Sequence, residues 1–87
     1  MVNRKIIVIN ESGLHARPAS TLVKAAAKFK SKITISKGEK SYDAKSLLGI
    51  LSAGISRGTE IVLECSGDDE AEALKGLAEL IEAGLGE

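Results

Sequence analysis

Residues 5–29 read KIIVINESGLHARPASTLVKAAAKF and contain a strand, a turn and a helix in succession. The β-branched run Ile6 to Ile9 predicts a strand from Lys5 to Asn10, and its lack of alternation predicts burial on both faces or a central place in a sheet. After the turn at 11–13, apolar residues recur every three or four positions, which predicts an amphipathic helix from about Ala16 to Lys28. The chain therefore opens with a βα unit.

Alternating polar and apolar residues predict three further strands. Two of them form a hairpin over 32–36 and 40–43, with a turn at 37–39. The third spans Glu60 to Ser66, where Ile61, Leu63 and Cys65 alternate with mostly polar neighbours.

Two further helices are predicted from their N-terminal signals. Ser46 occupies the favoured N-cap position before one or two helical turns at 47–51. Asp69 and Glu72 predict a capping box at the start of the last helix. The face of that helix expected to be buried carries Ala71, Leu74, Leu77, Ala78 and Ile81.

The predicted order is βαββαβα, which places the chain in the α+β class. Two βα units of this kind form one four-stranded antiparallel sheet with the helices packed on one face. We therefore expect an open-faced β-sandwich similar to the split βαβ plan.

The composition is that of an ordinary globular chain, with 44% hydrophobic and 28% charged residues and a formal net charge of zero. A neutral chain carries no long-range signal for nucleic acid or anionic membrane. Phe29 and Tyr42 are its only aromatic residues, too few for the stacking platforms that bind single-stranded nucleic acid. No apolar run is long enough for a membrane span or a signal peptide. We therefore expect a cytoplasmic protein with no nucleic-acid partner and no direct membrane insertion.

Charge is unevenly distributed along the chain. Residues 1–45 hold ten basic and three acidic side chains, whereas residues 46–87 hold two basic and nine acidic ones. The first half is suited to an anionic partner, while the acids of the second half gather where a helix dipole favours them. The single cysteine, Cys65, excludes an intramolecular disulfide and a multi-cysteine metal site, and we expect it to be a small buried residue.

The only histidine, His15, stands at the start of the first predicted helix. Unpaired backbone N–H groups and the helix dipole favour an anion there, so a phosphoryl group on this side chain would meet donors already in place. Arg17 adds a planar set of charged donors, and Pro18 fixes φ in the first turn. Because a neutral imidazole nitrogen is a nucleophile, this arrangement suits a reversible phosphoryl carrier.

Other chemistries lack the residues they need. There is no second histidine for a metal site, and nothing in the sequence places an acid beside His15 to form a catalytic triad. No glycine-rich stretch leads a strand into a helix with the spacing of a nucleotide-binding loop. We therefore expect no metal and no cofactor.

Two blocks of the sequence resemble the HPr family, the histidine-containing phosphocarriers of the bacterial sugar phosphotransferase system. Residues 12–19 read SGLHARPA, and residues 44–51 read AKSLLGIL and are followed by Gly54. The resemblance extends over all 87 residues, and the two blocks together are more specific than either alone. It implies a single HPr-like phosphocarrier domain over residues 1–87, which is a carrier and not an enzyme.

The resemblance also implies partners. In the family, enzyme I, itself charged by phosphoenolpyruvate, phosphorylates the histidine matching His15 on Nδ1, and the phosphoryl group then passes to IIA components of sugar transporters. In one branch, an ATP-dependent HPr kinase/phosphorylase modifies the serine matching Ser46. The product is a corepressor for a catabolite control protein, so carbon catabolite repression is a second expected role.

Further site residues follow from their places beside these two. We expect Ser12, Ala16 and Pro18 to support phosphate binding together with Arg17. One short turn cannot bury every aliphatic side chain it carries, so at least one leucine of the second block is expected at the surface as a docking contact. The partner-binding face implied by the family comprises Ser20, Leu47, Leu48, Leu51 and Gly54.

Two alternatives remain open. A relative within the family keeps the serine block, lacks the active histidine and acts only as a regulatory corepressor; the presence of His15 argues against that role. A nitrogen-related branch also keeps the histidine motif. The complete block around Ser46 favours the sugar branch.

Overall fold

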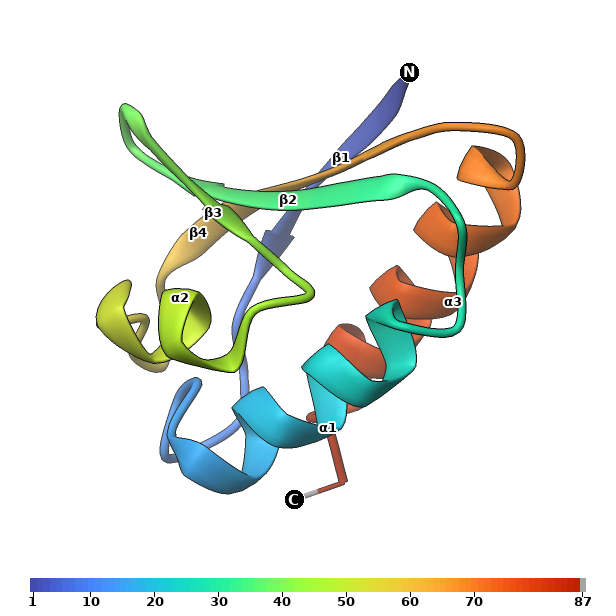
Figure 1. Ribbon diagram of the computed structural model, residues 1–87. Helices are drawn as coiled ribbons and strands as arrows, with labels where there is room; N and C mark the ends of the chain where they lie inside the picture. Colours follow the sequence, from blue (N-terminus) through green and yellow to red (C-terminus); the bar gives the residue numbers. More distant parts are fainter. Residues whose placement is uncertain (87) are drawn as a thin grey trace.

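The computed structural model describes residues 1–86, which form one antiparallel sheet covered by helices on one face (Figure 1). The strand order in the sheet is β1-β4-β2-β3. The elements, in chain order, are β1 Val2–Ile7, α1 Ala16–Ala26, β2 Lys32–Lys37, β3 Lys40–Asp43, α2 Leu47–Ser52, β4 Glu60–Ser66 and α3 Glu70–Glu82. The predicted fold class and element order are confirmed.

The core lies between the sheet and the helices, and its side chains are mostly aliphatic. The strand register determines which side chains meet in the core. Ile33 of β2 lies opposite Cys65 of β4, and Ile35 lies opposite Leu63, so these four buried side chains form adjacent rows. Fully burying a side chain of Leu or Ile size stabilises a fold by about 1.5 to 3 kcal/mol. The helices supply the facing layer with Ala19, Leu22, Ala26, Ile50, Ala73, Leu77, Ala78 and Ile81.

The first strand differs from its prediction. It spans Val2–Ile7 and is an edge strand, paired only with β4. Ile6 and Val8 are buried, whereas Ile7 is 48% and Ile9 is 53% exposed. Over residues 1–86, the helices cover one face of the sheet and β1 pairs with β4 alone, so burial on both faces and a central position are both wrong. The β-branched run alternates like any half-buried strand.

The start of the last helix also differs from its prediction. Asp69 is the N-cap residue of α3, but its carboxylate makes no capping bond within the helix. Instead it accepts hydrogen bonds from the backbone N–H groups of Lys30, at 2.8 Å, and Ser31, at 2.9 Å, and from the Ser31 hydroxyl. The capping box is therefore wrong, and Ala71, expected on the buried face, is exposed. The carboxylate ties α3 to the loop between α1 and β2.

These bonds perturb the titration of Asp69. The hydroxyl of Ser31, followed by the backbone N–H of Lys30, lowers the pKa of the Asp69 carboxyl to about 2. Each donor stabilises the ionised form, which is the form that joins the two segments. The tether is consequently strongest when Asp69 is charged.

Asp69→Asn is expected to lower the free energy of unfolding at neutral pH and to flatten its acid dependence. A carboxyl whose folded pKa lies below its unfolded value stabilises the fold above the unfolded pKa, near 3.9, and loses that contribution as pH falls towards about 2. Urea denaturation between about pH 7 and about pH 2 measures both effects. Asp68→Asn, at the exposed neighbouring position, should keep the parent profile; identical profiles for the two variants would contradict the role of Asp69.

Candidate functional site

His15 lies between β1 and α1 and is the N-cap residue of α1, as the sequence predicted. Its backbone is extended, and its carbonyl accepts the Ala19 N–H at 2.8 Å, which closes the first helical turn. The imidazole makes no capping hydrogen bond and is exposed. The ring is therefore available for chemistry while its backbone is fixed by the helix.

The loop before His15 is fixed by contact with a distant segment. The Leu14 N–H donates to the Ile55 carbonyl at 2.9 Å. Gly13 has φ +64°, and a Cβ placed on it would lie 2.4 Å from the Ile55 carbonyl oxygen and 2.7 Å from the Ser56 Cα. Only glycine allows this close approach, because any side chain would collide with backbone atoms that cannot rotate away.

Asn10 closes the same loop from the other side. Its side-chain amide donates to the Gly13 carbonyl, and its own carbonyl accepts the Gly13 N–H at 2.9 Å. Asn10 is buried, and its Oδ1 has no hydrogen-bond partner within residues 1–86. The two bonds hold residues 10–13 in a compact turn that delivers His15 to the helix start.

The opposite wall of the site is made by α2 and the loop after it. Ser46 caps α2 as predicted, with its Oγ accepting the Gly49 N–H at 3.0 Å. The helix ends at Ser52, and Gly54, with φ +63°, turns the chain back towards β4. The C-terminal end of α2 and the N-terminal end of α1 therefore approach each other.

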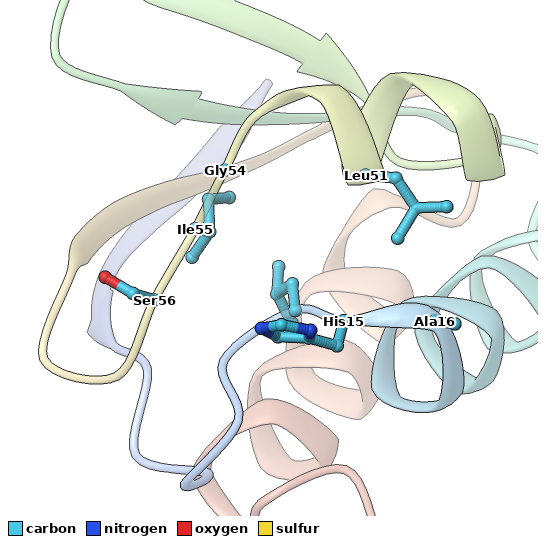
Figure 2. Close-up of a pocket in the computed structure, with 7 residues that line it drawn as sticks. His15, Ala16, Leu51, Gly54, Ile55 and Ser56 are labelled. Atoms are coloured by element: carbon cyan, nitrogen blue, oxygen red, sulfur yellow. The ribbon is translucent and has the colours of Figure 1, made fainter.

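A shallow hollow of about 240 Å³ lies between these two helix ends. Figure 2 shows the imidazole of His15 extending from the start of α1 towards the loop that carries Ile55, with Leu51 projecting from α2 above. The lining residues are Leu14, His15, Ala16, Leu51, Gly54, Ile55 and Ser56.

The structure thus brings four predicted site residues into one pocket: His15, Ala16, Leu51 and Gly54. The other predicted residues do not line it. Ser12 and Arg17 are exposed, Pro18 is buried within the first turn of α1, and Ser20 is half-buried on that helix. Ser46 is the N-cap residue of α2, at the opposite end of that helix from Gly54.

The leucines of α2 form an exposed apolar surface. Leu47 is 42%, Leu48 is 79% and Leu51 is 38% exposed, whereas Ile50 is fully buried. The prediction that this short helix shows at least one leucine to solvent is confirmed. Leu51 joins this surface to the pocket of His15.

Sequence reasoning missed Leu14, Ile55 and Ser56, which line the pocket, and Gly13, which allows the walls to meet. The contact between residues 13–14 and 55–56 joins segments some forty positions apart, so no local periodicity reports it. The available signal was the pair of glycines, Gly54 and Gly58, that bracket the second segment immediately after the leucine block.

The geometry is suited to holding an anion beside an imidazole. The N–H groups of Ala16 and Arg17 occupy the first turn of α1, where no helical acceptor exists for them, and Pro18 has no N–H. Within residues 1–86, the Arg17 guanidinium has no hydrogen-bond or ion-pair partner. Two backbone donors and one free cation therefore lie within one turn of His15.

Among the described residues 1–86, no helix is long and apolar enough to cross a membrane. Over the same part of the chain, no group of three or more His, Cys, Asp or Glu side chains is placed to hold a metal ion.

Comparison with known proteins identifies the class. A family model described as the phosphorylation site of the HPr component of the phosphotransferase system matches residues 2–83. The phosphocarrier protein HPr of Neisseria meningitidis is 38% identical over 87 residues, which cover 100% of this chain and 98% of the relative. The chain belongs to the HPr family of phosphocarrier proteins.

Solved structures agree with this assignment. HPr from Thermoanaerobacter tengcongensis is 47% identical, with a TM-score of 0.96 over 100% of this chain and 98% of that one. Crh from Bacillus subtilis, a catabolite repression protein described as an intertwined dimer with a swapping domain, is 40% identical. Its TM-score is 0.78 over 97% of each chain.

Gly13→Ala is expected to destabilise the protein more than Gly38→Ala. Both glycines have φ near +63°, so each alanine is expected to introduce backbone strain of about 1 to 2 kcal/mol. Only Gly13 adds a collision with Ile55 and Ser56, since nothing lies within 4 Å of a Cβ on Gly38. Thermal or urea denaturation of both variants measures the difference in the free energy of unfolding. Equal losses in the two variants would show that the loop at Gly13 can move away from Ile55 and Ser56 without cost.

Proposed function

We propose that this protein carries a phosphoryl group on His15 Nδ1, receiving it from phosphorylated enzyme I and passing it to IIA components. The observation that carries the proposal is the exposed imidazole, free of any capping bond, at the start of α1 and on the edge of the pocket. Membership of the HPr family supports it. The proposed location is the cytoplasm, and the proposed unit is one domain over residues 1–87.

The proposed step is a direct phosphoryl transfer. The lone pair of neutral His15 Nδ1 attacks phosphorus, the bond between phosphorus and the phosphate-carrying group of enzyme I breaks, and its electron pair stays with that group. No water enters, and in the second transfer an acceptor group of a IIA component attacks the same phosphorus, so that the His15 Nδ1–phosphorus bond breaks and its electron pair returns to Nδ1. The protein's contribution is to position the imidazole and stabilise the transferred charge.

The residues around His15 have distinct proposed roles. Arg17 supplies charged donors to the phosphoryl oxygens, and the backbone N–H of Ala16, in the first helical turn, supplies a further donor to them. Pro18, buried in that turn, keeps the helix start rigid, and Ser12 adds a polar group from the preceding loop.

The proposed docking face extends from the pocket across α2. Leu47, Leu48 and Leu51 provide exposed apolar area, while Ser20 and Gly54 border it from α1 and the following loop. Such a patch is typical of a binding surface, since an isolated soluble domain gains nothing by exposing three large aliphatic side chains on one turn. Enzyme I and the IIA components are proposed to use this face in turn.

His15→Ala should fold normally and accept no phosphoryl group. The side chain is exposed and caps nothing, so its removal leaves the core intact while the only imidazole is lost. Incubation with enzyme I, phosphoenolpyruvate and Mg²⁺, followed by intact mass measurement, tests this. An acid-labile phosphoryl group on the His15→Ala protein would overturn the assignment.

Ser46 is the proposed site of regulatory phosphorylation by an HPr kinase/phosphorylase, with a catabolite control protein as the partner of the product. Its hydroxyl is half-buried as the N-cap of α2, where a phosphate would meet the helix dipole. The similarity to Crh makes a purely regulatory role the second candidate, and a nitrogen-branch carrier remains the other alternative. Phosphorylation of His15 by enzyme I would reject the purely regulatory role.

Ser46→Asp should fold at least as stably as the parent and bind enzyme I more weakly at low salt. Aspartate is a good N-cap, so the helix keeps its start. Ser46 begins the helix that carries the proposed docking face, so the new charge would repel acidic groups of the docked partner, and salt screens this repulsion, with a Debye length of about 10 Å at 0.1 M. Raising the salt concentration should restore part of the affinity.

Titration of enzyme I at two salt concentrations, with a melting curve, measures these effects. Ser66→Asp is the matched control, because it adds the same charge at an exposed position on β4. Normal affinity of Ser46→Asp, or a loss that coincides with unfolding, would contradict the electrostatic mechanism.

A further inference from the structure

We propose that Lys37 is a positioning residue for phosphoryl transfer at His15, acting through the wall of the pocket that faces the imidazole. The inference rests on the proposed carrier function and adds a residue outside both sequence blocks. Lys37 is the last residue of β2 and does not line the pocket itself.

The contact is made by the side-chain ammonium group of Lys37. Its Nζ donates to the Ala53 carbonyl at 3.3 Å and to the Gly54 carbonyl at 3.2 Å. The next carbonyl along the chain, that of Ile55, accepts the Leu14 N–H at 2.9 Å. Three consecutive carbonyls after α2 are therefore each bound to a donor, two of them by one lysine.

These carbonyls need an external tether. Gly54 has φ +63°, its N–H donates to the Leu51 carbonyl at a long 3.4 Å, and nothing lies within 4 Å of a Cβ placed on it, so its peptide groups are weakly held by their own surroundings. Glycine reaches both signs of φ at little cost, and its peptide groups can therefore rotate when unbound. Lys37 removes this freedom on one side of the loop, as Leu14 does on the other.

The charge of the contact is as important as its geometry. Carbonyl oxygens at the end of a helix carry partial negative charge, and a phosphoryl group on His15 adds further negative charge and more acceptor oxygens. A carbonyl rotated towards the phosphoryl group would oppose it. By holding the Ala53 and Gly54 oxygens on its own ammonium group, Lys37 keeps two acceptors occupied beside the anion site.

The effect should fall on the chemical step more than on docking. The hydrogen bonds of Lys37 reach the docking face at its border, through the Gly54 carbonyl, and the exposed leucines of α2 are unaltered by a change at Lys37, so partner association should be preserved. Misplaced groups beside a reacting atom lower the rate within the complex. We expect Lys37→Met to reduce kcat of phosphorylation by enzyme I roughly three- to thirtyfold while KM stays within about twofold.

Three variants test the proposal. Lys37→Met removes the donors but keeps the length of the side chain, whereas Lys37→Arg keeps charge and donors and should recover kcat to within about twofold of the parent. Lys40→Met is the matched control, because Lys40 lies opposite Lys37 in the β2–β3 register, is exposed, and its ammonium group makes no hydrogen bond or ion pair within residues 1–86. The amide resonances of Gly54 and Ile55 should shift in Lys37→Met and stay unchanged in Lys40→Met.

Each outcome decides a separate point. A parent protein that accepts no phosphoryl group defeats the proposed function. A phosphorylated parent matched in kcat by Lys37→Met defeats the role of Lys37 alone, as does an equal loss in Lys40→Met, which would indicate a general effect of charge. A rise in KM at unchanged kcat would place Lys37 on the docking face and overturn the positioning role.

Discussion

The close approach of Gly13 and Leu14 to the Ile55–Ser56 backbone is the constraint on which the site depends. Gly13 lacks a side chain where one would collide with the Ile55 carbonyl, and the Leu14 N–H binds that same carbonyl. Leu14 is itself buried, so the residue directly before His15 is anchored in the core. The contacts of Gly13 and Leu14 therefore position the imidazole at the pocket, while the ring itself makes no capping hydrogen bond.

Two helix ends of opposite polarity meet at this contact. The N-terminal end of α1 offers free N–H groups, whereas the C-terminal end of α2 offers carbonyls. A phosphoryl group is favoured by the first and opposed by the second. In the proposed carrier function, the carbonyls that follow α2 would not oppose the phosphoryl group, because they are already bound, by Leu14 from one side and by Lys37 from the other.

Much of this arrangement was predictable from local sequence patterns. The 3.6-residue and two-residue periodicities gave the order of elements, and the boundaries of β4 agree with their prediction to the residue. The Ser46 cap was also predictable, because an N-cap involves only neighbouring residues. His15 was evident as the sole imidazole at a helix start.

The errors and omissions share a physical cause, which is that they depend on segments distant in sequence. Whether Ile7 and Ile9 are buried depends on the absence of a helix over the second face of the sheet, which the strand itself does not report. Asp69 had the sequence of a helix cap, but the loop at Lys30 and Ser31 supplies stronger partners. Ile55, Ser56 and Lys37 enter the site through contacts that only the folded chain creates.

The construction of the pocket from residues 13–16 and 51–56 makes chemical competence a property of the whole fold. The walls meet only when the hydrogen bond between Leu14 and Ile55 closes a loop of about forty residues, and such closure is entropically costly in an open chain. A nascent or partly unfolded chain would expose the same imidazole without the surrounding walls. If His15 is the carrier as proposed, phosphoryl groups would be committed mainly to folded molecules, and the protein would need no separate check on immature chains.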